Sequence, residues 1–105
     1  MEKIKVLLVC GGGASSGFMA TNLRKAAKAR GVEVDAKARS ETEVELYAPE
    51  VDCIMIGPHL SYLEEEMRNR VKDTGAKVLV MNRTYYSTLD GDAALDDLLS
   101  QFDSK

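Results

Sequence analysis

Short apolar runs alternate along the chain with longer segments in which apolar residues recur every three or four positions. The runs at 4–9, 51–56 and 77–81 are almost continuously apolar, as in parallel strands that are covered on both faces. Residues 32–38 alternate apolar and polar positions, which predicts a strand with one exposed face. The pattern therefore predicts four strands.

Helical spacing separates these strands. The predicted helices run from about Gly17 to Arg30, from Ser40 to about Tyr47, from Gly57 to near Gly75, and from Asp92 toward the C-terminus. Gly31 ends the first helix, and Pro49 closes the second. Ser40 followed by Glu43 is a capping-box pattern, and Asp92 is the predicted cap of the last helix, after a loop through Asp90 and Gly91.

The alternation of strand and helix predicts the fold class. It is typical of an α/β domain with a parallel sheet, right-handed crossovers and helices on both faces. We expect residues 1–105 to form one such three-layer domain. Ligands of these sheets bind outside the carboxyl ends of the strands. Those ends are predicted near Cys10, Ala38 to Ser40, Gly57 to His59, and Asn82 to Tyr86.

Composition narrows the function classes. The chain has 45% hydrophobic and 30% charged residues and a net charge of −3, so we expect a soluble protein whose main partner is not nucleic acid. No apolar run approaches the roughly 20 residues that span a membrane, and the first run ends in glycines without a cleavage pattern. The 2 cysteines do not suggest a disulfide scaffold. The expected compartment is the cytoplasm, without direct membrane insertion.

The segment between the first strand and the first helix carries the candidate chemistry. It reads Cys10, Gly11, Gly12, Gly13, Ala14, Ser15, Ser16, Gly17. Small residues let successive backbone N–H groups turn around an oxyanion, and a helix N-terminus adds partial positive charge. A cysteine at the mouth of such a loop is expected to have a lowered pKa. The pattern describes a nucleophilic thiolate beside a phosphate-sized nest, with hydroxyl donors from Ser15 and Ser16.

Other interpretations of this loop remain open on the residues alone. A tight glycine turn with an inert buried cysteine fits equally well. A dinucleotide-binding loop is weaker because Ser16 stands where the third glycine belongs, and a Walker A loop fails because no Gly-Lys-Ser/Thr follows. A non-catalytic, flavodoxin-like module that binds anions or nucleotides is a further alternative.

Three segments together resemble one protein family. The cysteine loop, the stretch Val51-Asp52-Cys53-Ile54-Met55-Ile56-Gly57-Pro58 with Tyr62, and Tyr86 with Leu89-Asp90-Gly91 occur in register. They are similar to the IIB components of the lactose/cellobiose (chitobiose) class of bacterial phosphoenolpyruvate-dependent sugar phosphotransferase systems. The resemblance covers about the whole chain. It implies a four-stranded parallel sheet of order 2-1-3-4, similar to low-molecular-weight tyrosine phosphatases.

The resemblance also implies an activity. Cys10 would accept a phosphoryl group from a phosphohistidine of a IIA protein and donate it to a sugar bound by a membrane IIC partner. That sugar would be a β-diglucoside such as cellobiose, or lactose or chitobiose. No metal or organic cofactor is implied. The chain departs from the family pattern at His59, where glutamine is more frequent, and at Gly17, where a hydroxyl residue is frequent.

A phosphatase or arsenate-reductase-like hydrolase is the enzymatic alternative. Such a loop places arginine six positions after the cysteine, where it grips phosphate and stabilises the transition state. Here that position is Ser16, and the next arginine, Arg24, lies about two helical turns further on. Slow hydrolysis of the phosphocysteine would follow, which suits a carrier.

Several other residues are candidates for accessory roles. His59 follows the third strand and is expected at the same sheet edge as Cys10, where it would contact phosphate or a partner or be a polar surface residue. Asp90 is a candidate acid or an Asp-Gly turn residue. Cys53 lies within an apolar run and is predicted to be core, and nothing in the sequence suggests a metal site.

An apolar rim beside the loop is the candidate docking surface for IIA and IIC. Phe18, Met19 and Tyr62 are the residues expected to form it, with core packing as the alternative for Met19.

Overall fold

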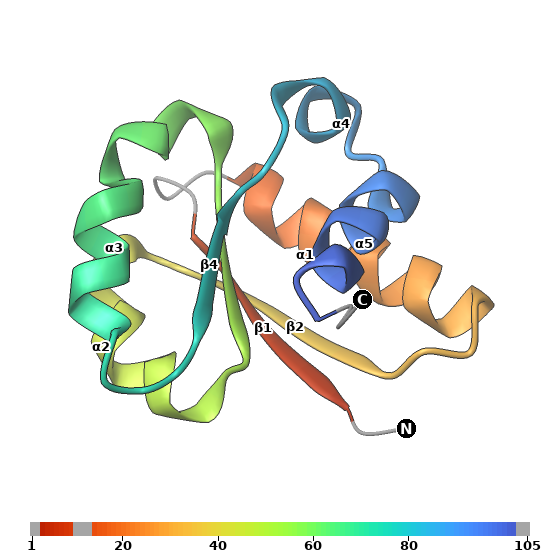
Figure 1. The fold of residues 1–105 in the computed structure, drawn as a ribbon. Coiled ribbons are helices and arrows are strands. Elements are labelled where there is room, and N and C mark those ends of the chain that lie inside the picture. Colours follow the sequence, from red (N-terminus) through yellow and green to blue (C-terminus); the bar gives the residue numbers. More distant parts are fainter. Residues whose placement is uncertain (1–2, 10–13, 103–105) are drawn as a thin grey trace.

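The computed structural model describes residues 3–9 and 14–102 (Figure 1). The helices and strands are β1 (Ile4–Val9), α1 (Ala14–Ala29), β2 (Val34–Arg39), α2 (Val44–Tyr47), β3 (Cys53–Ile56), α3 (Glu64–Val71), β4 (Lys77–Val80), α4 (Arg83–Thr88) and α5 (Gly91–Ser100). Short 3₁₀ turns occupy Glu41–Glu43, Ala48–Glu50 and Pro58–Leu63. The strands form one parallel sheet of order β2-β1-β3-β4, as the resemblance implied.

Side chains of alternate residues along each central strand build two separate cores. Val6 and Leu8 of β1 face the layer of α1 and α5, whereas Leu7 and Val9 face α2 and α3 (Figure 1). A strand buried on both faces needs apolar residues at every position, which explains the continuous runs of β1 and β3. The edge strand β2 alternates because its outer part is half exposed. The predicted three-layer α/β architecture is confirmed.

Helix α1 begins three residues before its predicted start at Gly17. Its first turn is made of small and polar residues, and an apolar pattern marks only the turns that are buried. Its end is as predicted: Gly31 adopts φ +74°, and its N–H donates to the Lys28 carbonyl. The Val32 N–H donates to the Ala27 carbonyl at 2.9 Å, which completes a Schellman motif. Val32 therefore belongs to the helix cap, and β2 begins at Val34 instead of Val32.

The predicted capping box before α2 does not form. The Ser40 hydroxyl accepts a hydrogen bond from the Thr42 N–H at 3.3 Å, and the Glu43 side chain makes no capping bond. The segment is therefore a 3₁₀ turn followed by a single α-helical turn. Pro49 does not close the helix but lies within the next 3₁₀ turn, where its missing N–H costs nothing.

The third and fourth strands are shorter than predicted. β3 begins at Cys53 because the Val51 N–H donates to the Ala48 carbonyl of the preceding turn instead of joining the ladder. The helix expected from Gly57 opens as the 3₁₀ turn Pro58–Leu63 and becomes α-helical at Glu64.

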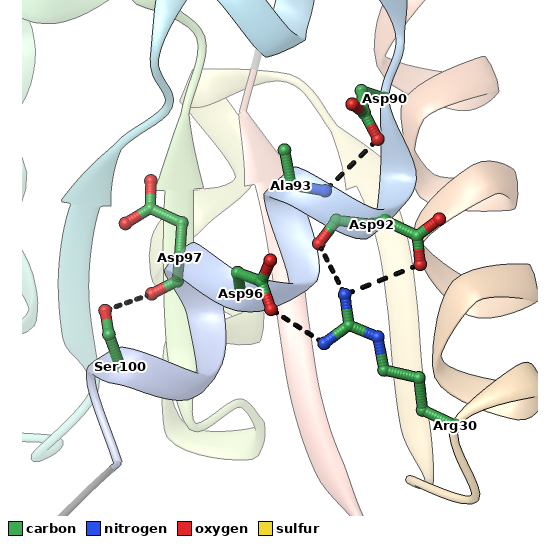
Figure 2. A network of polar contacts seen from close by, with 7 residues as sticks. All are labelled: Arg30, Asp90, Asp92, Ala93, Asp96, Asp97 and Ser100. Atoms are coloured by element: carbon green, nitrogen blue, oxygen red, sulfur yellow. Dashed lines mark hydrogen bonds and ion pairs between the residues drawn. The ribbon is translucent and has the colours of Figure 1, made fainter.

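Helix α4 was not predicted, and the cap of α5 was assigned to the wrong aspartate. The Asn82 side chain caps α4 by accepting from the Thr84 N–H at 2.7 Å. Leu89, at φ +56°, ends α4 and reverses the chain. Asp90 then caps α5 by accepting from the Ala93 N–H at 3.2 Å (Figure 2). A six-residue polar helix has no apolar stripe that a pattern could reveal.

Asp92 instead lies in the first turn of α5 and binds Arg30 at the end of α1. The guanidinium contacts one Asp96 oxygen at 2.7 Å and one Asp92 oxygen at 3.5 Å (Figure 2). These contacts raise the pKa of Arg30, chiefly through the Asp96 hydrogen bond, and lower the pKa of Asp96. The two helices on this face of the sheet are thereby connected by charge as well as by packing.

The outer edge of β2 is occupied by arginine side chains. The Arg24 Nη1 donates to the Ala36 carbonyl at 2.6 Å, and the Arg39 Nη1 donates to the Ala38 carbonyl at 2.8 Å. Carbonyl groups on an open sheet edge are otherwise available to pair with another strand.

Candidate functional site

The carboxyl ends of three strands meet beside the segment that carries Cys10. Val9, the last residue of β1, pairs with Arg39 on one side and with Ile56 on the other. The Gly57 N–H donates to the Val9 carbonyl at 2.8 Å, which holds the end of β3 level with the end of β1. The chain then passes from Val9 to the start of α1 at Ala14.

The predicted phosphate loop falls partly outside the described residues. Those outside are Cys10, Gly11, Gly12 and Gly13. The remaining members, Ala14, Ser15, Ser16 and Gly17, form the first turn of α1. The first N–H groups of a helix have no acceptor within it, and the helix dipole favours an anion there. The phosphate-binding roles of all eight residues stay predictions.

Arg24 is engaged elsewhere, in keeping with its predicted distance from the loop. Besides the Ala36 carbonyl, its guanidinium contacts the Thr21 hydroxyl at 3.3 Å. Both acceptors lie along the middle of α1 and β2, so this arginine serves the sheet edge.

Arg39 is the last residue of β2 at this edge of the sheet, and it was not singled out from the sequence. Its guanidinium lies over the Tyr47 ring, 5.2 Å from the centroid, and Nε donates to the Tyr47 hydroxyl at 3.2 Å. The hydrogen bond to Tyr47 is the main cause that raises the pKa of Arg39, and Glu43 contributes less. Its place at the end of a predicted strand could be read from the sequence, but that this strand lies beside β1 follows only from the sheet order.

The structure brings His59 and Tyr86 together at the same edge. His59 is exposed in the turn after β3, and Tyr86 lies on α4. Their ring centroids are 6.0 Å apart at an interplanar angle of 43°. The expectation that His59 lies at the carboxyl edge is thus met, whereas its contact with phosphate stays a prediction.

The candidate docking residues divide into two groups. Phe18 is 61% exposed and Tyr62 is 75% exposed, so both are accessible to a partner. Met19 is 0% exposed and packs in the core between α1 and the sheet, so its assignment to the docking surface was wrong and the core alternative holds.

The remaining candidates have structural roles. The Asp90 carboxylate caps α5, which supports the turn interpretation and removes the reason to assign it as an acid. Cys53 is completely buried, and burial is the main cause that raises the pKa of its thiol to about 12, followed by the Asp97 charge. A thiol that stays protonated is a poor nucleophile, so the prediction that Cys53 is core is confirmed.

The described residues contain no group of three or more His, Cys, Asp or Glu side chains that could hold a metal ion. In the same part of the chain, no helix has the length and apolar character that crossing a bilayer requires.

A family model identifies the chain. The model of the lactose/cellobiose-specific IIB subunit of the PTS system matches residues 5–97. The chain belongs to this family. The match includes both the cysteine loop and the Gly-Pro turn on which the resemblance was based, and the resemblance is confirmed.

Curated relatives of this IIB chain differ in length. It is 27% identical over 96 residues to the oligo-beta-mannoside-specific EIIB component of Bacillus subtilis, covering 91% of this chain and 93% of that protein. It is 31% identical over 104 residues to the lactose-specific EIICB component of Lactococcus lactis, covering 97% of this chain but 18% of that protein. The IIB chain therefore corresponds to nearly all of the first relative and to under a fifth of the second.

Solved structures share the fold. The lactose-specific IIB component domain from Streptococcus pneumoniae superposes with a TM-score of 0.85 at 22% identity, covering 94% of this chain and 97% of that one. The cellobiose-specific IIB component from Borrelia burgdorferi gives 0.78 at 23% identity, covering 99% and 95%. The IIB fold is thus common to chains of quite different sequence.

Proposed function

We propose that the chain is a cytoplasmic IIB phosphocarrier in which Cys10 carries the phosphoryl group. The donor is a phosphohistidine of a IIA protein, and the acceptor is a sugar bound by a membrane IIC protein. Residues 1–105 act as one domain in this scheme. The observation that carries the proposal is the position of Cys10 in the sequence, between the end of buried β1 and the first turn of α1, in a chain of the IIB family.

The chemistry consists of two balanced displacements. The Cys10 thiolate attacks phosphorus, the S–P bond forms, and the N–P bond breaks with its electron pair left on the imidazole nitrogen, which takes a proton from water. In the second step a sugar hydroxyl oxygen attacks phosphorus, loses its proton to solvent, and the thiolate leaves. Covalent relay of this kind divides one transfer into two steps.

The N-terminus of α1 would stabilise the anion in both steps. Its first N–H groups, from Ala14 to Gly17, have no acceptor within the helix, and the hydroxyls of Ser15 and Ser16 add donors. Gly11, Gly12 and Gly13 would complete the nest with their backbone amides. These groups orient the phosphoryl group without the arginine that a hydrolase uses.

Partner docking is proposed on the exposed aromatic residues. Phe18 on α1 and Tyr62 in the turn after β3 are both exposed aromatic side chains that a partner could contact. The relatives named EIICB support a IIC partner for this chain. The names of the family and of its relatives support a β-linked disaccharide or oligosaccharide, such as lactose, cellobiose or an oligo-β-mannoside, as the class of sugar.

Intact-mass measurement tests the carrier. After incubation with phosphorylated IIA protein, wild-type chain should gain one phosphate, and Cys10→Ser should gain none. Cys53→Ala is the matched control, because it removes the other, buried thiol and should still be phosphorylated. Equal phosphorylation of wild type and Cys10→Ser would contradict the proposal.

A further inference from the structure

A hollow lies where the chain turns from α1 into β2, at the amino end of the sheet (Figure 1). Its volume is about 420 Å³, within the range of roughly 300–1,000 Å³ that is usual for pockets that hold small molecules. Ile4, the first residue of β1, pairs here with Val34, the first residue of β2. β1 rises about 3.3 Å per residue, so its two ends are roughly 17 Å apart. The hollow is therefore separate from the carboxyl edge of the sheet.

The apolar floor of the hollow is fixed by the fold. Val32 and Val34 line it, are half-buried, and pack against the core that α1 shares with the sheet. The Val32 N–H is bound within the helix cap that Gly31 makes, and the Glu33 carbonyl accepts from the Ile4 N–H at 2.9 Å. These bonds hold the backbone beneath the hollow, so its shape does not depend on a free loop.

Positive charge surrounds this floor. Three cations line the hollow, Lys3, Arg24 and Lys28, against one carboxylate, Glu33. Arg24 and Lys28 are one turn apart on α1 and so lie on the same face of the helix. This local surplus of positive charge is contrary to the net charge of −3 that the whole chain carries.

The cations are available to a ligand. Among residues 3–9 and 14–102, the ammonium groups of Lys3 and Lys28 have no hydrogen-bond or ion-pair partner. Arg24 donates to the Ala36 carbonyl through Nη1 and to the Thr21 hydroxyl through Nη2, which fixes the guanidinium but uses only part of its donor capacity. Like charges gathered around one hollow repel one another, and a bound anion removes that repulsion.

We propose that this hollow binds a small organic phosphate. The phosphate lies among Lys3, Arg24 and Lys28, and the carbon part of the ligand packs on the two valines of the floor. A phosphate monoester carries about two negative charges at neutral pH, which matches three cations set against one carboxylate. Arginine and lysine are the usual donors to phosphate oxygens. The site does not include Cys10, and the inference does not rest on the carrier function.

Titration with phenyl phosphate, followed by the amide NMR signals of the isotope-labelled chain, tests the site. Saturable shifts are expected in the amides of residues 31–34, and inorganic phosphate should bind more weakly because it has no apolar part. Lys3→Gln and Lys28→Gln should each weaken binding about fivefold, which is the effect of one unit charge at about 4 Å in water. Glu33→Gln should strengthen binding by a similar factor, because it removes a carboxylate that repels the ligand. All three substitutions change exposed side chains, so the fold should be retained.

Lys25→Gln is the matched control. Lys25 is also an exposed lysine of α1, but it lines a different hollow, beside Gly91 and Asp92. Its removal should change the affinity by less than about twofold. Cys10→Ser should bind phenyl phosphate as wild type does, whatever the outcome of the phosphorylation experiment.

Three results would overturn the inference. These are shifts that do not saturate, shifts confined to residues 14–17 at the start of α1, and a loss of affinity in Lys25→Gln equal to that in Lys28→Gln. The second result would assign phosphate binding to the start of α1 instead, and the third would show only a general attraction of anions to α1.

Discussion

We expect different chemistry from the two cysteines of this chain. Cys53 packs between β1, β4 and the α1/α5 layer, where an ionised sulfur would lose its hydration and face the Asp97 charge. Cys10 lies in the sequence between the end of β1 and the start of α1, and a thiolate there is part of the proposed function. Burial thus gives Cys53 a structural role, whereas the carrier role proposed for Cys10 rests on its place in the sequence.

The raised pKa of Cys53 predicts a loss of stability in alkali. The pKa of the Cys53 thiol is 9.0 in the unfolded chain and about 12 in the folded chain. The stability that this difference contributes to the folded chain is therefore complete below pH 9 and is lost as the pH rises to 12. In a Cys10→Ser background, the free energy of unfolding should fall between these values by up to about 1.4 kcal/mol per pH unit. Denaturant titrations at several pH values measure it. An equally steep slope in Cys10→Ser/Cys53→Ala would disprove the assignment.

The glycine at the start of α5 is required by a close approach of two helices. A Cβ on Gly91 would lie 2.3 Å from the carbonyl oxygen of Asn22 on α1, and the Asn22 side-chain amide already donates to the Leu89 carbonyl at 2.8 Å. Gly91→Ala should therefore lower the free energy of unfolding by about 2 kcal/mol or more.

Gly17 provides the matched control for the same substitution. It lies inside α1, and no atom of the described residues comes within 4 Å of a Cβ built there. Gly17→Ala should stabilise the chain by roughly 0.5–1 kcal/mol, since alanine loses less backbone entropy in a helix. Urea unfolding of both variants measures whether the two changes in the free energy of unfolding have opposite signs. Equal changes would refute the close-approach argument.

At the scale of elements, a side-chain hydrogen bond links helix α4 to α5. The buried Tyr85 hydroxyl donates to an Asp97 oxygen at 2.6 Å. Burial is the largest cause that raises the pKa of Tyr85, and the Asp97 hydrogen bond is the second. The contact ties α4 to α5 on the same side of the sheet.

Removing that hydroxyl should loosen α4. Tyr85→Phe is expected to lower the free energy of unfolding by about 1–2 kcal/mol, because a hydrogen bond to a charged acceptor is lost. Hydrogen exchange of the α4 amides should speed up more than that of β1 and β3. Tyr62→Phe, which changes a 75% exposed residue, should alter neither measurement. Unchanged exchange in α4 would show that other contacts hold it.

The elements that carry long apolar runs could be predicted, and those defined by polar contacts could not. β1 and β3 are buried on both faces, so their hydrophobic residues identify them directly. The start of α1, the 3₁₀ turns around Pro49, and α4 depend on backbone and side-chain hydrogen bonds that leave no periodic pattern. The α5 cap was assigned to Asp92 instead of Asp90 for the same reason, since either aspartate suits the start of a helix.

The sequence suggests a candidate site only where its residues are neighbours along the chain, and the phosphate loop stays a prediction. Eight consecutive residues suggested the phosphate loop, and the sheet rule placed His59 at the same edge. The pairing of Arg39 with the last residue of β1 could not be found this way, because it depends on strand order and register. Met19 was misassigned because its neighbour Phe18 is exposed, and adjacent helical residues point in different directions.

At the scale of the whole molecule, the chain should store phosphate instead of hydrolysing it. The position of the hydrolase arginine is Ser16, and Arg24 is bound to the edge of β2. Loss of one such donor costs on the order of 3 kcal/mol in transition-state stabilisation, or about 100-fold in rate. Purified chain should show turnover of p-nitrophenyl phosphate no higher than that of Cys10→Ser. Robust turnover that disappears in Cys10→Ser would favour the phosphatase alternative.

The two arginines on the outer side of β2 affect how easily the sheet could pair with a second copy of the chain. Since Arg24 and Arg39 already occupy the carbonyl oxygens of Ala36 and Ala38, a second molecule finds few acceptors on that margin with which to extend the sheet. In the proposed carrier role the chain would bind a donor protein and then an acceptor, and self-association along this edge would compete with both. Guanidinium groups that cover the carbonyl oxygens of this edge would limit such pairing between two copies.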